Sequence, residues 1–156
     1  MQNPELFVDN LQAVIEASFS NAQPPEKIVE HDCQECREID RIFRNQNWRT
    51  IEPEKIEWAY DKLPLFTPEA HHYFLPAFML YSLRNPGSVV CDFVFYNLAT
   101  SKSETEWWQK RLDKFTETQK EACRLFLKWL ELQPEYNAED SKNIERALEK
   151  WWKTKA

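Results

Sequence analysis

The chain has 156 residues, which suits one domain with a single hydrophobic core, and its 26 acidic and 20 basic residues give a net charge of −6. This charge argues against binding to nucleic acid or to an anionic membrane, because both attract basic surfaces, and it favours a basic protein as partner. The single glycine, Gly87, excludes the glycine-rich phosphate loops of nucleotide-binding folds and favours helices over hairpins.

The first predicted helix begins at Pro4, with Asn3 as its cap. Apolar residues recur every four positions and define the face that packs on the core: Phe7, Leu11, Ile15 and Phe19. The start of the chain carries acidic residues where a secretory signal would carry basic ones before an apolar stretch. We therefore expect a cytoplasmic protein.

A second helix is predicted from Asp32, because Glu35 follows three residues later and completes the pattern of a capping box. Cys33 and Cys36 would then lie in the first turn of this helix. A short third helix is expected to begin at Pro53, and a proline after Leu63 would end it.

The central helix is predicted to begin after Thr67, which can act as its cap, and it is apolar on almost all sides. Pro76 lies inside it and should kink it, because proline removes one backbone hydrogen bond and crowds the preceding turn. Residues 88–99 are ambiguous, since their β-branched and aromatic residues favour a strand. We predict a helix there, because no partner strand is apparent.

Three further helix starts follow in the C-terminal third of the chain. Ser103 and Thr116 are each followed three residues later by Glu or Gln, the pattern of a capping box, and the second of these predicts a break near Phe115. The last helix should open near Asn137. The sequence therefore predicts an all-α fold, a compact bundle of about seven or eight helices that forms one domain over residues 1–156.

The stretch His31-x-Cys33-x-x-Cys36 has the short spacing with which histidine and cysteine bind zinc. The absence of an export signal favours a reducing compartment, where cysteines stay free, bind metal or catalyse, and seldom form structural disulfides. A zinc site needs a fourth ligand, which would have to be His71, His72, Cys91, Cys123 or a water, and we take His71 as the first candidate. A second cysteine pair at a distance, which would strengthen the hypothesis, is missing from the sequence.

Two other interpretations of this stretch stay open. In a redox site, the first turn of the helix would stabilise the Cys33 thiolate, although Glu30, Asp32 and Glu35 would oppose it. In the structural interpretation, which we favour, both cysteines are small, half-buried apolar residues. We therefore expect no cofactor, with zinc as the alternative.

Seven tryptophans are present, and two pairs are adjacent in the sequence: Trp107-Trp108 and Trp151-Trp152. Neighbouring helical residues point about 100° apart, so one core-facing stripe cannot bury both members of a pair. Large aromatic side chains are common in the centres of protein interfaces. We predict that Trp108 and Trp152 contact a partner, either another protein or a second copy of this chain.

Three stretches together resemble a family of small bacterial proteins catalogued as a domain of unknown function. They are "CQECREI", "LPLFTPEAHHYFLPAFMLYSL" and "FTETQKEACRLFLKWL". The similarity covers roughly residues 30–130. It implies a bacterial cytosolic protein of mainly helical structure and transfers no catalytic residue.

No hydrolase, metalloprotease or deaminase motif occurs in the sequence, and a single Glu69-x-x-His72 lacks the second copy that a di-iron site needs. The main hypothesis is therefore a non-catalytic protein-interaction module, such as an immunity-type or regulatory partner of a basic protein. The alternative is a zinc-stabilised domain, or a thiol- or metal-dependent enzyme, that uses His31, Cys33 and Cys36.

Overall fold

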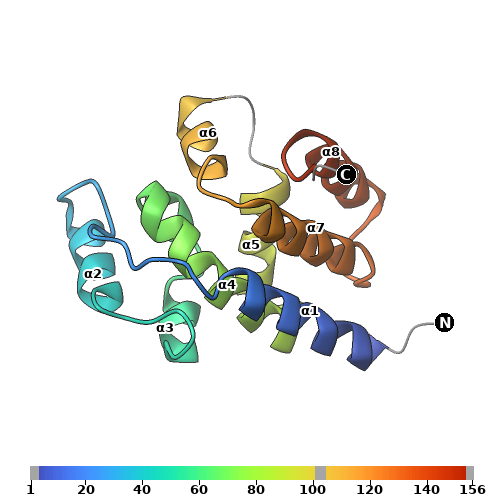
Figure 1. Cartoon of the computed structure of the whole chain (residues 1–156), viewed down its shortest axis with the longest axis horizontal. Helices are drawn as coiled ribbons and strands as arrows, with labels where there is room; N and C mark the ends of the chain where they lie inside the picture. The colour runs from blue at the N-terminus through green and yellow to red at the C-terminus, as the bar shows by residue number, and fades with distance from the viewer. Residues whose placement is uncertain (1–3, 101–104, 154–156) are drawn as a thin grey trace.

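The computed structural model describes residues 4–100 and 105–153 (Figure 1). These ranges form eight α-helices and one 3-10 helix, η1: α1 (Pro4–Ser18), α2 (Gln34–Phe43), α3 (Pro53–Trp58), η1 (Leu63–Leu65), α4 (Pro68–Arg84), α5 (Val89–Ala99), α6 (Glu106–Leu112), α7 (Glu117–Glu131) and α8 (Ala138–Lys150). Extended pairing in these ranges is limited to one isolated bridge between Val29 and Phe66. The all-α prediction and the predicted number of helices are confirmed.

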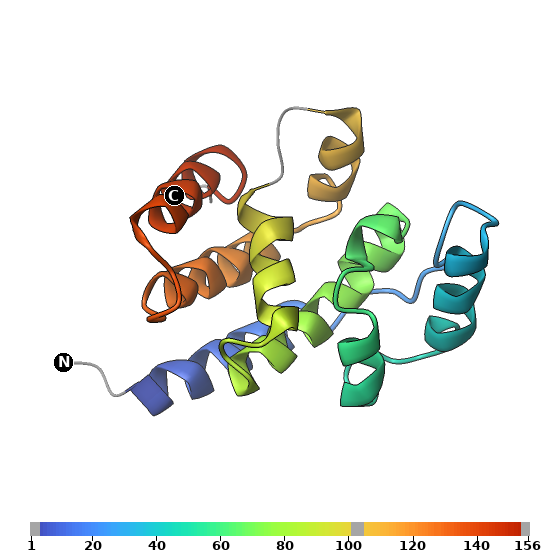
Figure 2. The same cartoon turned by 180° about the vertical axis from the view of Figure 1, so that it is seen from behind.

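Helix α4 lies in the middle of the molecule. Figures 1 and 2 show it between α2 and α3 at one end of the long axis and α7 and α8 at the other. It contacts α1, α3, α5 and α6, which explains why thirteen of its seventeen residues are buried. The helix continues through Pro76, and its predicted cap, Thr67, accepts a hydrogen bond from the Ala70 amide at 3.1 Å.

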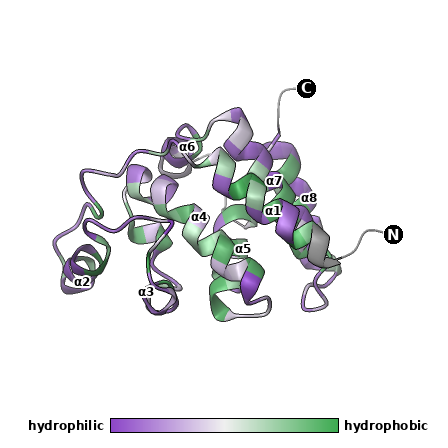
Figure 3. Cartoon of the chain, turned by 60° about the horizontal axis from the view of Figure 1, so that its bottom comes forward, coloured by the Kyte–Doolittle hydropathy of each residue, from purple (hydrophilic) through white to green (hydrophobic). Residues whose placement is uncertain are grey.

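The ambiguous stretch 88–99 is helical, as predicted, and forms helix α5 from residue 89 onward. Ser88 caps it by accepting a hydrogen bond from the Cys91 amide at 3.2 Å, and the preceding turn places Gly87 at a φ of +80°, which glycine adopts without strain. Figure 3 shows mainly hydrophobic ribbon on α5. This helix packs on α4, α7 and α8, so its apolar residues are covered on several sides.

The aromatic residues of the core connect the two ends of the molecule. Phe43 at the end of α2 packs against Phe66 and Phe74, with ring centroids 5.1 and 5.0 Å apart. At the other end, Trp152 lies edge-on to Phe115 at 5.3 Å. One continuous core therefore runs from α2 to the residues that follow α8.

Two helix starts differ from the prediction. The cap of α2 is Cys33 instead of Asp32, because the Cys33 sulfur accepts the Cys36 amide at 3.3 Å. The predicted cap Ser103 and the predicted cap Asn3 lie outside the described residues, and α6 is capped by Thr105.

Within residues 4–100 and 105–153, no helix has the length and apolar character that a membrane crossing requires.

The capping box of α7 is confirmed and gives a first prediction. The Thr116 hydroxyl accepts the Gln119 amide at 3.2 Å, and the Gln119 side chain accepts the Thr116 amide at 2.9 Å. Thr116→Ala should lower the free energy of unfolding by about 1 kcal/mol, measured by urea denaturation. The control, Thr50→Ala, removes an exposed hydroxyl that makes no hydrogen bond in the described residues and should change it by less than about 0.5 kcal/mol.

Candidate functional site

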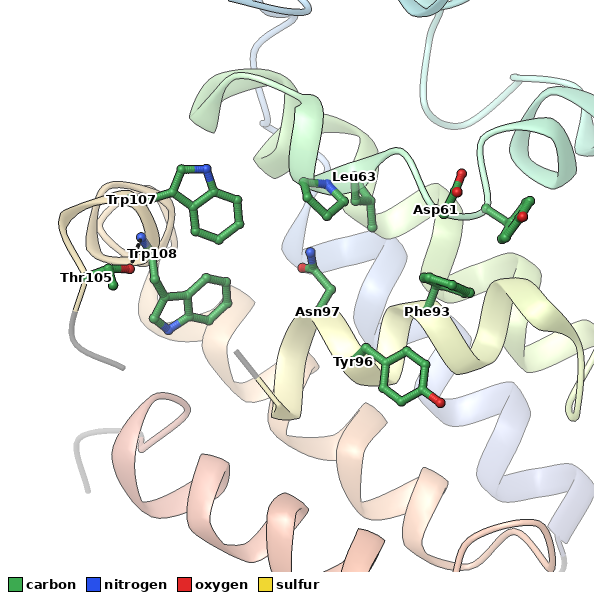
Figure 4. Close-up of a pocket in the computed structure, with 10 residues that line it drawn as sticks. Asp61, Leu63, Phe93, Tyr96, Asn97, Thr105, Trp107 and Trp108 are labelled. Carbon is green, nitrogen blue, oxygen red and sulfur yellow. Dashed lines mark hydrogen bonds between the residues drawn. The ribbon is translucent and has the colours of Figure 1, made fainter. Parts of the chain in front are cut away.

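A cavity of about 330 Å³ opens between the α3–η1 segment, α5 and α6. We call it the aromatic cleft and define it by its lining residues: Tyr60, Asp61, Leu63, Pro64, Phe93, Tyr96, Asn97, Thr105, Trp107 and Trp108. In Figure 4 the two tryptophans face Phe93 and Tyr96 across the opening, and Asn97 lies between them. The cleft has the size of a small-ligand site or of a pocket for a partner's side chain.

Helix α5 supplies one wall of the aromatic cleft. Phe93, Tyr96 and Asn97 are three and four residues apart, so one face of the helix presents all three. Phe93 also contacts Tyr60 and Tyr96 edge-on, with ring centroids 5.2 and 5.5 Å apart. These contacts hold the aromatic wall in place, while Tyr60 and Tyr96 stay 38% and 50% exposed at its rim.

Helix α6 supplies the opposite wall. Arg111 is buried beneath Trp107, with its guanidinium carbon 3.9 Å from the indole centroid, and it donates hydrogen bonds to the carbonyls of Trp107 and Phe66. Burial lowers the pKa of Arg111, although Glu30 and Glu69 oppose this change. The guanidinium thus fixes the Trp107 ring against the protein body and leaves it 42% exposed.

The polar groups of the aromatic cleft are few and held in defined orientations. Asn97 Oδ1 lies 2.7 Å from Nε2 of the buried His71, so this nitrogen carries the ring proton and donates it. The Asn97 amide nitrogen has no acceptor among the described residues and is available as a donor to the cleft. His71 is therefore a positioning residue for this donor.

Asp61 is the only charged residue among the described residues that line the aromatic cleft. Its Oδ1 is buried, accepts no hydrogen bond in the described part of the chain, and lies 3.5 Å from Lys62 Nζ. Lys62 is shared with Glu35, whose carboxylate is 3.2 Å away. One lysine therefore faces two carboxylates, those of Asp61 and Glu35.

The predicted zinc ligands do not meet in the structure. Cys33 and His31 are exposed beside α2, whereas His71 is fully buried in α4 and bonded to Asn97. Within the described residues, no three histidine, cysteine or acidic side chains are close enough together to hold a metal ion. The predicted set of four ligands is therefore not assembled in this structure.

A family model described as a family of unknown function, DUF6714, matches residues 9–156. The chain belongs to the DUF6714 family. The match confirms the resemblance to an uncharacterised family and extends it over almost the whole chain. No curated protein and no solved structure matches the chain.

This DUF6714 protein exposes a different tryptophan of the first pair from the one predicted. Trp108 lines the aromatic cleft but is 1% exposed, while Trp107 forms the accessible part of the wall. Trp152 is fully buried, and its indole nitrogen donates to the Leu98 carbonyl at 2.9 Å. The side chains predicted to contact a partner are thus turned inward, because α6 and the residues after α8 pack their second tryptophan onto the core.

Sequence reasoning missed most of the aromatic cleft of this DUF6714 protein. Its lining residues come from three segments, 60–64, 93–97 and 105–108, and their meeting depends on tertiary packing. One signal was available: once residues 88–99 are taken as a helix, Phe93, Tyr96 and Asn97 fall on one face.

Proposed function

We propose that this protein is a non-catalytic, cytoplasmic interaction module whose basic partner protein docks on the aromatic cleft. The observation that carries the proposal is the convergence of three exposed aromatic side chains, those of Tyr60, Tyr96 and Trp107, around one cavity. Exposed aromatic residues beside a preformed pocket are typical of the energetic centres of protein interfaces. An immunity-type or regulatory role fits this form of binding.

The charges of the chain and of the aromatic cleft support a basic partner. The net charge of −6 attracts basic proteins over a distance, and Asp61 offers a carboxylate at the mouth of the cleft. An apolar side chain of the partner would fill the cavity, and a neighbouring Lys or Arg would pair with Asp61. The Asn97 amide can donate a hydrogen bond to a backbone carbonyl of the inserted segment.

The test uses a displayed library of random peptides, from which the peptides that bind the wild-type protein are selected. Peptides enriched on the wild-type protein are synthesised, and their affinities are measured by titration calorimetry. We expect enriched peptides to combine an aromatic or aliphatic anchor with Lys or Arg. Trp107→Ala should weaken their binding by at least about tenfold, because it removes the exposed wall of the cleft.

Trp58 offers a matched control. Trp58 is 38% exposed, and its ring centroid lies 5.5 Å from Lys62 Nζ, so a cation faces its ring as Arg111 faces the ring of Trp107. Unlike Trp107, it does not line the aromatic cleft. Trp58→Ala should change the affinity less than about twofold. Asp61→Asn should reduce the dependence of binding on salt. Failure to enrich any peptide, or equal losses in the two tryptophan variants, would contradict the proposal, and selection of acidic peptides would refute its electrostatic part.

A further inference from the structure

Cys33 and Cys36 share the first turn of α2, a helix of ten residues. Cys33 is exposed and its sulfur accepts the Cys36 amide at 3.3 Å, while Cys36 is 1% exposed beneath it. We propose that Cys33 and Cys36 form a thiol–disulfide exchange pair, in which Cys33 attacks a low-molecular-weight disulfide and Cys36 resolves the product. This activity is independent of the aromatic cleft.

The two thiols are placed for unequal roles. The hydrogen bond from the Cys36 side chain, followed by that from the Cys36 amide, lowers the pKa of the Cys33 thiol against the smaller effects of burial and of Glu35. Burial raises the pKa of the Cys36 thiol, and its interaction with Cys33 raises it further. The exposed sulfur is therefore the one that ionises first and can reach a substrate, and the buried sulfur is kept protonated beside it.

The acidic residues around Cys33 oppose its thiolate less than the sequence suggests. Arg37 Nε lies 3.7 Å from Asp32 Oδ1, and Lys62 Nζ lies 3.2 Å from Glu35 Oε2. Two of the three carboxylates near Cys33 in the sequence are thus paired with a cation. The first-turn amide that points at the sulfur supplies local positive potential in addition.

The exchange balances in two steps. The Cys33 thiolate attacks one sulfur of the small disulfide, which forms a mixed disulfide and releases one thiolate. Cys36 then loses its proton to solvent and attacks Cys33 Sγ, which closes the Cys33–Cys36 disulfide and releases the second thiolate. The protein loses two electrons and two protons, the small disulfide gains the two electrons, and its two thiolates take up protons from water.

The experiment uses the full chain and glutathione disulfide in the presence of a chelator, with intact-mass spectrometry after acid quenching and with peptide mapping. We expect the wild type to lose two hydrogens without keeping an adduct, and the bond to map to Cys33–Cys36. Cys36→Ala should accumulate a stable glutathione adduct on Cys33. In variants that keep only one cysteine of this pair, Cys33 should react with glutathione disulfide at least about tenfold faster than Cys36 at neutral pH.

Cys33→Ser serves as the control for folding, because serine is a favoured N-cap and keeps an acceptor for the Cys36 amide. It should keep the circular dichroism spectrum of the wild type and form neither the adduct nor the disulfide. A persistent adduct in the wild type would overturn the proposal, since Cys36 would then not resolve it. Reaction no faster at Cys33 than at Cys36, or a failure to oxidise in excess glutathione disulfide, would overturn it as well.

Discussion

Replacing Trp152 with alanine is expected to lower the free energy of unfolding by about 3–5 kcal/mol, the largest effect of any substitution considered. Trp152 is fully buried although it follows the last residue of α8. Its ring packs edge-on against Phe115 and Trp108, with centroids 5.3 and 6.1 Å away, and its nitrogen donates to the Leu98 carbonyl. The side chain therefore anchors the residues that directly follow α8 to α5, to α6 and to Phe115 in the link between α6 and α7.

Urea denaturation of three variants separates the causes of this loss. Trp152→Phe keeps an aromatic ring but leaves the Leu98 carbonyl without its donor, so it should cost less than the alanine variant. Trp151→Ala is the matched control, because Trp151 is only half-buried and contacts Trp108 from the edge of the core. We expect Trp151→Ala to lower the free energy of unfolding by less than half as much as Trp152→Ala. Equal losses from the two alanine variants would contradict this packing.

The fold was largely predictable because its local signals agree with one another. Proline or a capping residue stands at most of the helix starts, the α7 capping box forms with its expected partners, and α8 opens after Asn137 as predicted. Residues 88–99 show where local preference is weak: their composition favours a strand, but burial on several sides and the Ser88 cap decide for a helix. The α2 start was misplaced because cysteine is not among the usual capping residues, although its sulfur accepts the amide here.

The candidate site was much less predictable than the fold. A helical period says that Trp107 and Trp108 point in different directions, but not which one the rest of the protein covers. That choice depends on Arg111, which is buried against Trp107, and on Trp152, which packs onto Trp108. The Arg111–Trp107 contact lies within α6, but the hydrogen bond that holds Arg111 to the Phe66 carbonyl and the contact between Trp152 and Trp108 join segments that are neighbours only after folding.

His71 should make the stability of the protein fall in mild acid. Burial lowers the pKa of His71 from 6.5 to about 4, partly opposed by its hydrogen bond to Asn97, and the charge of Arg111 lowers it further. Because the unfolded chain binds a proton near pH 6.5 and the folded chain does so only near pH 4, stability is complete above about pH 6.5 and falls as the pH drops towards 4. The difference between these two pKa values corresponds to a loss of about 3 kcal/mol in the free energy of unfolding.

The comparison of two histidine variants isolates this effect from the rest of the acid response. His71→Gln keeps a donor for Asn97 without a titrating ring, so its free energy of unfolding should fall less than that of the wild type between about pH 7 and pH 4.5. His31→Gln changes an exposed histidine and should follow the wild-type profile. His72, whose pKa is also lowered by burial and whose charge lowers the pKa of His71, and Glu69, whose pKa is lowered by Lys114, are present in all three proteins and contribute to each profile. A His71→Gln profile parallel to that of the wild type would mean that the imidazole is hydrated in solution, and the Asn97 donor would then not be held towards the aromatic cleft.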